Sequence, residues 1–167
     1  MPLTIRPFAE ADREAAVELF LQLNRHEFAI TGDRRTDRGG GEFCVEDMVQ
    51  AVGQGAVALV AETAGLVVGL LVWNAHSDEA YMAETARRHG RVQDIVIAEA
   101  HRGKGIGQAL LAEAERLTRE AGMRRLKLTV LSGNDVAIDA YGRFGFRDYA
   151  RVMVKDFDRA SSARRNP

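Results

Sequence analysis

Residues 92–121 read VQDIVIAEAHRGKGIGQALLAEAERLTREA, and this stretch decides the fold of the chain. An apolar run ends at Ile97, a turn with three glycines follows over residues 102–107, and the rest has apolar residues at helical spacing. The predicted order is therefore strand, glycine-rich turn, helix. Such a turn leaves free backbone N–H groups at the positive end of a helix, and Arg102 and Lys104 add positive charge. The stretch is thus typical of a phosphate or pyrophosphate site.

Two common phosphate-binding loops do not fit this turn. A P-loop needs Ser or Thr after its Gly-Lys pair, whereas Gly105 follows Lys104. A dinucleotide-binding fingerprint would need a third glycine at position 108, which is Gln108. What fits is Arg-x-x-Gly-x-Gly over residues 102–107, a pattern that a simple helix-capping turn would also satisfy.

A second motif, NDVAIDAYGRFGF, covers residues 134–146. Its first residue, Asn134, is a good N-cap, and Gly145 is suited to end a helix. The apolar positions between them recur at helical spacing and are Ala137, Ile138, Tyr141 and Phe144. Taken alone, this pattern predicts a helix packed on a core and no particular chemistry.

Composition limits the classes of function. The 167 residues suit one domain, over 1–157, followed by a disordered tail over 158–167. Lys and Arg total 23 against 24 Asp and Glu, so the net charge of −1 indicates no pull toward nucleic acid or membrane. Cys44 is the single cysteine, and no Cys/His cluster has ligand spacing, so neither a disulfide nor a metal is expected. Without a leader or a long apolar run, the protein is expected to be cytoplasmic.

The order of elements along the chain predicts an α/β (α+β) fold with a mixed, mostly antiparallel sheet. Strands are expected at 3–7, 56–62, 66–74, 92–97, 126–131 and 151–156. Helices are expected at 10–25, 44–53, from the glycine turn to 121, and at 135–144. Residues 31–42 are predicted to be a flexible loop because they are polar and include three successive glycines, and residues 75–91 are predicted to be loop or one irregular helical turn.

The two motifs, in this order and at this distance, resemble the GNAT superfamily of N-acetyltransferases. Its second pattern, Asn-x-x-Ala-x-x-x-Tyr-x-x-x-Gly-Phe, is matched at every fixed position by residues 134–146. The resemblance covers nearly the whole chain and implies the GNAT fold, with about six or seven strands and about four helices. It also implies that the strands at 92–97 and 126–131 run parallel and splay apart around a cofactor.

The resemblance implies acetyl-CoA as cosubstrate, with no metal. Backbone groups of the glycine turn would hold the pyrophosphate, and the end of the central strand would pair with the pantetheine arm. The residues that the resemblance assigns to the cofactor are Ile95, Val96, Ile97, Arg102, Gly103, Lys104, Gly105, Ile106, Gly107, Asn134, Ala137, Tyr141 and Arg143.

Tyr141 matches the family's general acid, which protonates the departing thiolate; packing in the core is the other reading of this residue. The positions where family members often carry a base are Arg91 and Gln93 here, and neither can accept the proton. Asp94 is the tentative base or substrate ligand, although strand alternation turns it away from the face of Gln93 unless a β-bulge intervenes. Further candidates are Glu27, His76, Glu84 and His89, and a chain of water molecules would also serve.

The expected function is direct, ternary-complex transfer of an acetyl group to a primary amine of a small molecule or peptide. Mixed charges in the loops leave the acceptor open. Two alternatives remain: a non-catalytic acyl-CoA-binding module that regulates or binds a partner, and transfer of a longer acyl group. Dimerisation is common among similar proteins, so a homodimer is a further partner that the resemblance allows.

Overall fold

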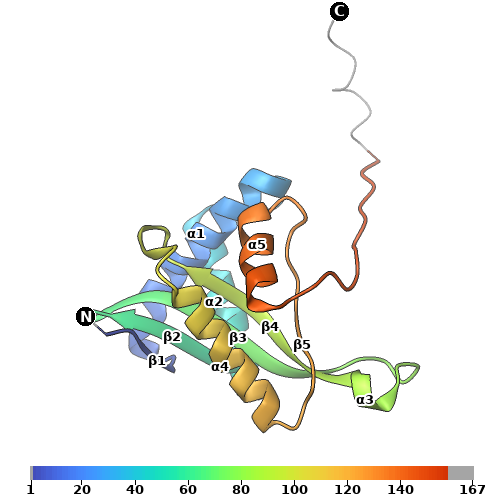
Figure 1. The fold of residues 1–167 in the computed structure, drawn as a ribbon. Helices are drawn as coiled ribbons and strands as arrows, with labels where there is room; N and C mark the ends of the chain where they lie inside the picture. Colours follow the sequence, from blue (N-terminus) through green and yellow to red (C-terminus); the bar gives the residue numbers. More distant parts are fainter. Residues whose placement is uncertain (1, 158–167) are drawn as a thin grey trace, which may run out of the picture.

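The computed structural model describes residues 2–157, and Figure 1 shows the elements in chain order. The strands are β1 (Thr4–Pro7), β2 (Val57–Thr63), β3 (Leu66–Ser77), β4 (Arg88–Ile97) and β5 (Leu126–Leu128). The helices are α1 (Arg13–Thr31), α2 (Arg38–Gly53), α3 (Glu84–Arg87), α4 (Ile106–Glu120) and α5 (Asp135–Phe144), with short 3-10 turns at Glu10–Asp12 and Glu99–His101. The predicted tail, residues 158–167, lies outside the described residues. No described helix is long and apolar enough to cross a membrane.

The five strands form one mixed sheet in the order β1-β2-β3-β4-β5. All neighbours are antiparallel except β4 and β5, which are parallel. The predicted α/β class and mixed sheet are confirmed, but the strand count is lower than expected. The strand predicted at 151–156 is wrong, because this run pairs with no strand and Val152, Met153 and Val154 are exposed. Residues 151–156 carry the apolar pattern of a strand, but the edge strand with which they could pair, β5, has only three residues.

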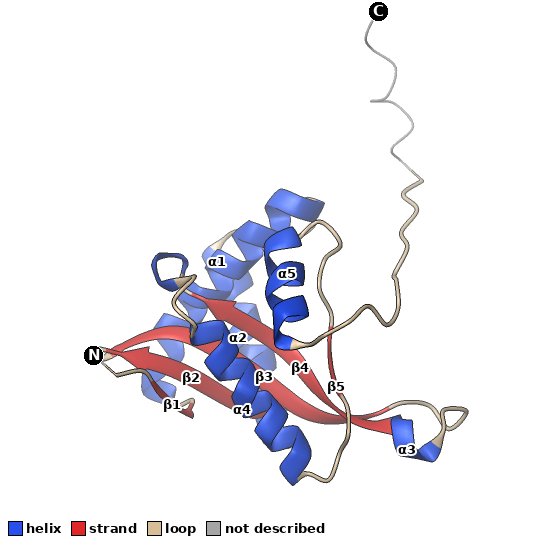
Figure 2. Cartoon of the chain, in the orientation of Figure 1, coloured by secondary structure: helices blue, strands red, loops and turns tan. Residues whose placement is uncertain are grey.

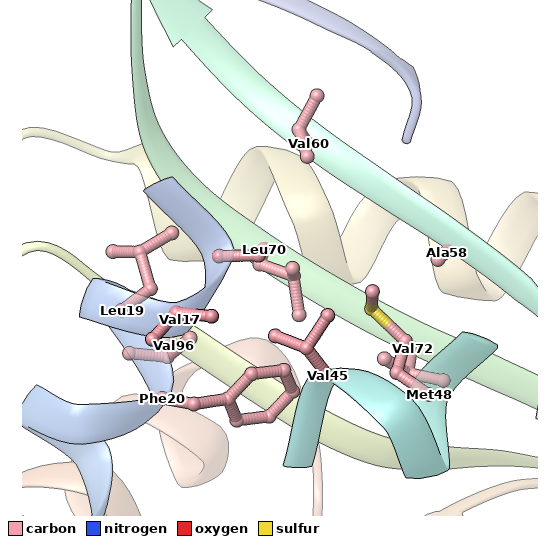
Figure 3. Close-up of a cluster of buried hydrophobic side chains, with 11 residues drawn as sticks. Val17, Leu19, Phe20, Val45, Met48, Ala58, Val60, Leu70, Val72 and Val96 are labelled. Carbon is pink, nitrogen blue, oxygen red and sulfur yellow. The ribbon is translucent and has the colours of Figure 1, made fainter. Parts of the chain in front are cut away.

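Helices cover both faces of the sheet, as Figure 2 shows, with α1 and α2 on one face and α4 and α5 on the other. We call these the α1 face and the α4 face. The core on the α1 face packs Phe20 of α1 and Val45 of α2 against Leu70 and Val72 of β3 (Figure 3). The core on the α4 face packs α4 against the alternate strand residues, and part of α5 rests on it.

The prediction of a loop over residues 31–42 is wrong for half of its length. Helix α1 continues to Thr31, and α2 begins at Arg38 and includes all three glycines. A Cβ atom on Gly41 would lie 2.7 Å from the backbone oxygen of Val17, so glycine is what lets the two helices approach. Asp37 caps α2 by accepting a hydrogen bond from the Gly40 N–H at 2.8 Å. The glycine run was predicted to make the loop flexible, but in the structure it forms a surface on which α1 and α2 pack.

Residues 75–91 are more regular than the sequence predicted. Strand β3 continues to Ser77 and β4 begins at Arg88, so a long antiparallel ladder pairs the polar ends of both strands. His76 faces His89 in this ladder, and the Asp78 N–H donates to the Arg87 carbonyl at 2.9 Å. Pairing between the two strands holds this segment, which lacks the apolar alternation that marks a strand in sequence.

Candidate acyl-transfer site

The central strand loses its parallel neighbour halfway along its length. Strands β4 and β5 pair only from Gly90 to Val92, while β4 continues to Ile97. Past that point no described strand pairs with this side of β4. This is the splay that the sequence analysis expected, and it leaves the backbone of residues 93–97 without a neighbouring strand on the β5 side.

The glycine turn sits directly after this part of β4. Gly103 and Gly105 have φ of +74° and +80°, a backbone region that glycine adopts without strain. No side chain caps the N-terminus of α4, whereas α2 and α5 are capped by an Asp and an Asn. The first N–H groups of α4 are therefore available to an anion, together with the positive end of the helix dipole.

The two basic residues of the turn hold its backbone. Arg102 Nε donates to the Ile97 oxygen at 3.2 Å, and Lys104 Nζ donates to the Ala100 oxygen at 3.0 Å. Both side chains are otherwise exposed, so their charge stays beside the α4 N-terminus. A Cβ on Gly107 would meet only Ile97, at an ordinary 3.9 Å, so the protein itself does not require glycine there.

Helix α5 places the second motif. Asn134 caps it by accepting from the Ala137 N–H at 3.3 Å, and Gly145 ends it with φ of +105°. The Tyr141 ring lies edge-on to that of Phe146, with the centroids 5.9 Å apart, and packs on the core of the α4 face. Burial, and secondarily the charge of Glu27, raise the pKa of Tyr141, so its phenol holds its proton at neutral pH. Arg143 is exposed in the last turn.

A β-bulge interrupts β4 at the place where it matters for Asp94. Val72 pairs with Asp94 and the next residue, Trp73, pairs with Val92, so Gln93 is an extra residue in β4. Val72 belongs to the α1 face and Trp73 to the α4 face. The bulge therefore turns Asp94 toward the α1 face, the side on which Gln93 contacts α2. The sequence analysis required such a β-bulge for Asp94 to lie on the same face as Gln93.

The carboxyl group of Asp94 is held in an unfavourable place for a charge. Burial raises the pKa of Asp94 to about 6, and repulsion from Asp47 of α2 and Glu27 of α1 adds to the effect. Gln93 and Arg91 act in the opposite direction but do not cancel it. A carboxyl group with this pKa is mostly ionised at neutral pH and binds a proton more strongly than an ordinary aspartate.

A chain of hydrogen bonds on the same face connects the sheet to α2. Arg91 Nε donates to Asn74 Oδ1 at 3.2 Å, and Asn74 Nδ2 donates to Gln93 Oε1 at 3.2 Å. Gln93 Nε2 in turn donates to Asp47 Oδ2 at 3.2 Å. The two residues that cannot act as bases therefore position other groups and fix the bulge.

The structure brings some of the predicted residues together and separates others. The charge of Glu27 raises the pKa of both Tyr141 and Asp94, although Tyr141 packs on the α4 face and Asp94 lies on the α1 face. Glu27 lies on α1 and not in a loop, and its Oε2 accepts from Arg34. Glu84 lies apart in α3. Sequence analysis missed Asp47, because nothing in its helix distinguishes it from an ordinary exposed acid.

Comparisons with known proteins identify the family. A model described as the acetyltransferase (GNAT) family matches residues 10–146. Streptothricin acetyltransferase of Streptomyces lavendulae is 47% identical over 55 residues, which is 33% of this chain and 29% of that protein. The chain spans between 24% and 46% of the length of the curated relatives it matches.

Solved structures show the same fold at low identity. A transcriptional regulator from Bacillus halodurans C-125 has a TM-score of 0.72 at 20% identity, over 93% of this chain and 100% of that one. The aminoglycoside N-acetyltransferase AAC(6')-Iy, solved with CoA, has a TM-score of 0.72 at 17% identity, over 93% and 94%. With the family model matching most of the chain, this protein belongs to the acetyltransferase (GNAT) family.

Proposed function

We propose that this protein is an acetyl-CoA-dependent N-acetyltransferase that acts on a primary amine of a cationic small molecule. The observation that carries the proposal is the uncapped N-terminus of α4 beside the unpaired end of β4. An anion-binding helix end next to a free strand edge suits a pyrophosphate joined to an extended amide-bearing arm. Coenzyme A is a molecule of this form, and a structural neighbour was solved with it.

In the proposed reaction, Asp94 accepts a proton from the amine and Tyr141 donates a proton to the departing thiolate. An alkyl ammonium, with a pKa of about 10.4, must lose a proton before its nitrogen can attack. The Asp94 carboxylate accepts that proton, directly or through water, and the amine nitrogen then bonds to the thioester carbon. The tetrahedral intermediate breaks its C–S bond, and the thiolate leaves with the Tyr141 proton. The amide nitrogen gives up its remaining excess proton, which restores the Tyr141 phenol, and Asp94 releases its proton to solvent. The products are an amide and free CoA.

Charge on the α1 face supports a cationic acceptor. The charges of Asp47 and Glu27 act on Asp94, and of these three carboxylates only Glu27 has an ion pair, with Arg34. An acceptor with more than one amino group would relieve their repulsion. The relative that acetylates streptothricin supports a small-molecule amine. A lysine side chain or a peptide N-terminus is the competing acceptor.

The experiment is thiol release from acetyl-CoA with a panel of amines, comparing the wild type with Tyr141→Phe. We expect polyamines and aminoglycosides to accelerate release, and the variant to lose at least ten-fold in kcat while still binding CoA. Equal rates in the two proteins would remove Tyr141 as the acid. Release stimulated only by peptides would overturn the small-molecule acceptor.

A second candidate function is a non-catalytic module that binds acyl-CoA. The observation in its favour is that Arg91 and Gln93 occupy positions where relatives often place a base. It predicts CoA binding without acceleration by any amine or peptide in the panel. A thermal shift on adding CoA, together with the same thiol-release panel, therefore separates the two functions.

A further inference from the structure

A separate cluster of three side chains lies at the far end of the β3–β4 ladder. Atoms of His76, Asp78 and His89 that are able to ligate a metal lie within 4.8 Å of one another. His76 and His89 are cross-strand partners, and their ring centroids are 5.2 Å apart. Asp78 follows β3 directly and is held there by its backbone bond to Arg87. Two imidazoles and a carboxylate are a donor set that zinc prefers.

The buried member of this cluster is His89, whose Nδ1 faces both a backbone carbonyl and the Asp78 carboxylate. Its side chain is 2% exposed, and Nδ1 lies 3.3 Å from the Arg87 carbonyl oxygen. Nδ1 is also the ring nitrogen that lies 3.7 Å from Asp78 Oδ2, so a metal shared with Asp78 would take the Nδ1 lone pair and replace the contact with the Arg87 carbonyl.

The carboxylate of Asp78 already attracts a cation. Lys127 Nζ lies 2.6 Å from Asp78 Oδ2, and the same oxygen is 3.7 Å from His89 Nδ1. A metal ion at this position would take over the charge compensation that the ammonium group supplies. Lys127 is therefore a competitor for the site, and its ammonium would move away from Asp78 when the metal binds.

We propose that His76, Asp78 and His89 bind one Zn²⁺ ion, with a fourth position left to water. Bond lengths near 2.1 Å place tetrahedral ligands about 3.4 Å apart, so small side-chain rotations from the observed separations suffice. The ion would tie the end of β3 to the start of β4. Sequence spacing missed the site because the strand register, and not a short motif, brings His76 to His89.

The site lies on the same face of the sheet as Arg91 and Asp94 but apart from them. His76 and His89 form one cross-strand pair, and Asn74 and Arg91 form the next pair on the same face toward the bulge. The partners of His89 and Asp94 on β3 are His76 and Val72, four residues apart, which is roughly 13 Å at about 3.3 Å per residue. Zinc binding is therefore independent of whether the acetyl-transfer proposal holds.

The test is a Zn²⁺ titration of chelator-treated full-length protein without a polyhistidine tag, with a chromophoric competitor as readout. We expect one ion per chain in the wild type and in the matched control His26→Ala. His76→Ala should bind at least ten-fold more weakly, and because His76 is partly exposed its loss should leave the fold intact. No binding by the wild type, equal affinity in His76→Ala, or loss of binding in His26→Ala would each overturn the site.

A second variant tests the role of Asp78. Lys127→Met keeps the aliphatic stem and removes the competing ammonium, so it should bind Zn²⁺ at least three-fold more tightly than the wild type. Equal or weaker binding would contradict coordination by Asp78. Substituting Co²⁺ gives an independent readout, because a tetrahedral site produces intense visible absorption that His76→Ala should lose.

Discussion

Replacing Asp94 with asparagine is expected to stabilise the fold and damage the activity at the same time. Burial and the charges of Asp47 and Glu27 raise the pKa of Asp94 from 3.8 to about 6. The folded state therefore binds a proton that the unfolded chain releases at lower pH. The stabilisation from this proton is complete below pH 3.8 and is lost as the pH rises through about 6. Above that pH the folded protein carries an unfavourable charge, which asparagine removes.

The magnitude follows from the size of the shift. A rise from 3.8 to about 6 is roughly two pKa units, and each unit is 1.36 kcal/mol. Asp94→Asn should therefore raise the free energy of unfolding by up to about 3 kcal/mol at pH 7.5. At pH 5 only part of the penalty has developed, so the gain should fall to about half. An exposed carboxylate such as Asp148 should show little change on the same substitution.

Urea unfolding at pH 5 and pH 7.5 measures the stability of the wild type, Asp94→Asn and Asp148→Asn. In parallel, kcat/KM of the wild type should fall as the pH drops below about 6, because Asp94 must be ionised to accept a proton. Asp94→Asn should be at least ten-fold slower at pH 7.5 and should lose this limb of the profile. An asparagine variant that is less stable than the wild type at pH 7.5 would refute the strained carboxylate, and one with full activity would refute the base.

Three further substitutions test the packing and the cofactor site. Gly107→Ala should weaken CoA binding at least ten-fold without lowering stability, because its Cβ has room in the protein but would meet a bound phosphate; Gly53→Ala, also at an open helical position, is the control in CoA titrations. Gly41→Ala should cost roughly 1–3 kcal/mol in urea unfolding, since its Cβ would lie 2.7 Å from the α1 backbone, and a cost no larger than that of Gly53→Ala would contradict this. Thr118→Val should cost about 1–3 kcal/mol, because the buried Trp73 indole N–H would lose its partner at 2.9 Å, and an unchanged urea midpoint would show that another acceptor takes over.

The regular helices and strands of the core were predictable because the pattern of hydrophobic residues indicates them. The apolar stripe of α4 reflects one buried face, whereas β2 and β3 are nearly continuous apolar runs because both of their faces are buried, and all three elements formed where the pattern indicated. The role of the glycines in α2 could not be predicted from the sequence. Gly41 is needed because the backbone of Val17 lies against it in space, although Val17 is distant in the sequence. The run at 151–156 failed for the opposite reason, since β propensity without a partner strand does not make a strand.

The local structure at the proposed cofactor side was more predictable than that at the proposed acceptor side. A glycine turn, an uncapped helix start and the Asn134 cap are local in sequence, so their residue types report on them directly. The acceptor side that we propose is assembled from α1, α2 and β4, and its carboxylates Glu27, Asp47 and Asp94 come together only through tertiary packing. No local pattern distinguishes them from the other acids of the chain.

The bulge at Gln93 explains why the identity of the residues at 91 and 93 does not decide between enzyme and binding module. Strict alternation would give the α1 face Arg91 and Gln93 and would turn Asp94 toward α4. The extra residue changes the phase, so Asp94 joins Gln93 on the α1 face, and Gln93 is held by Asn74 and Asp47. A carboxylate therefore reaches the acceptor side from a position that alternation assigns to the other face. Asp94 is also the group whose charge the fold tolerates least well, and a base that costs stability is kept for its chemistry. On this reasoning the physical cost at Asp94 favours the enzyme over the passive acyl-CoA binder.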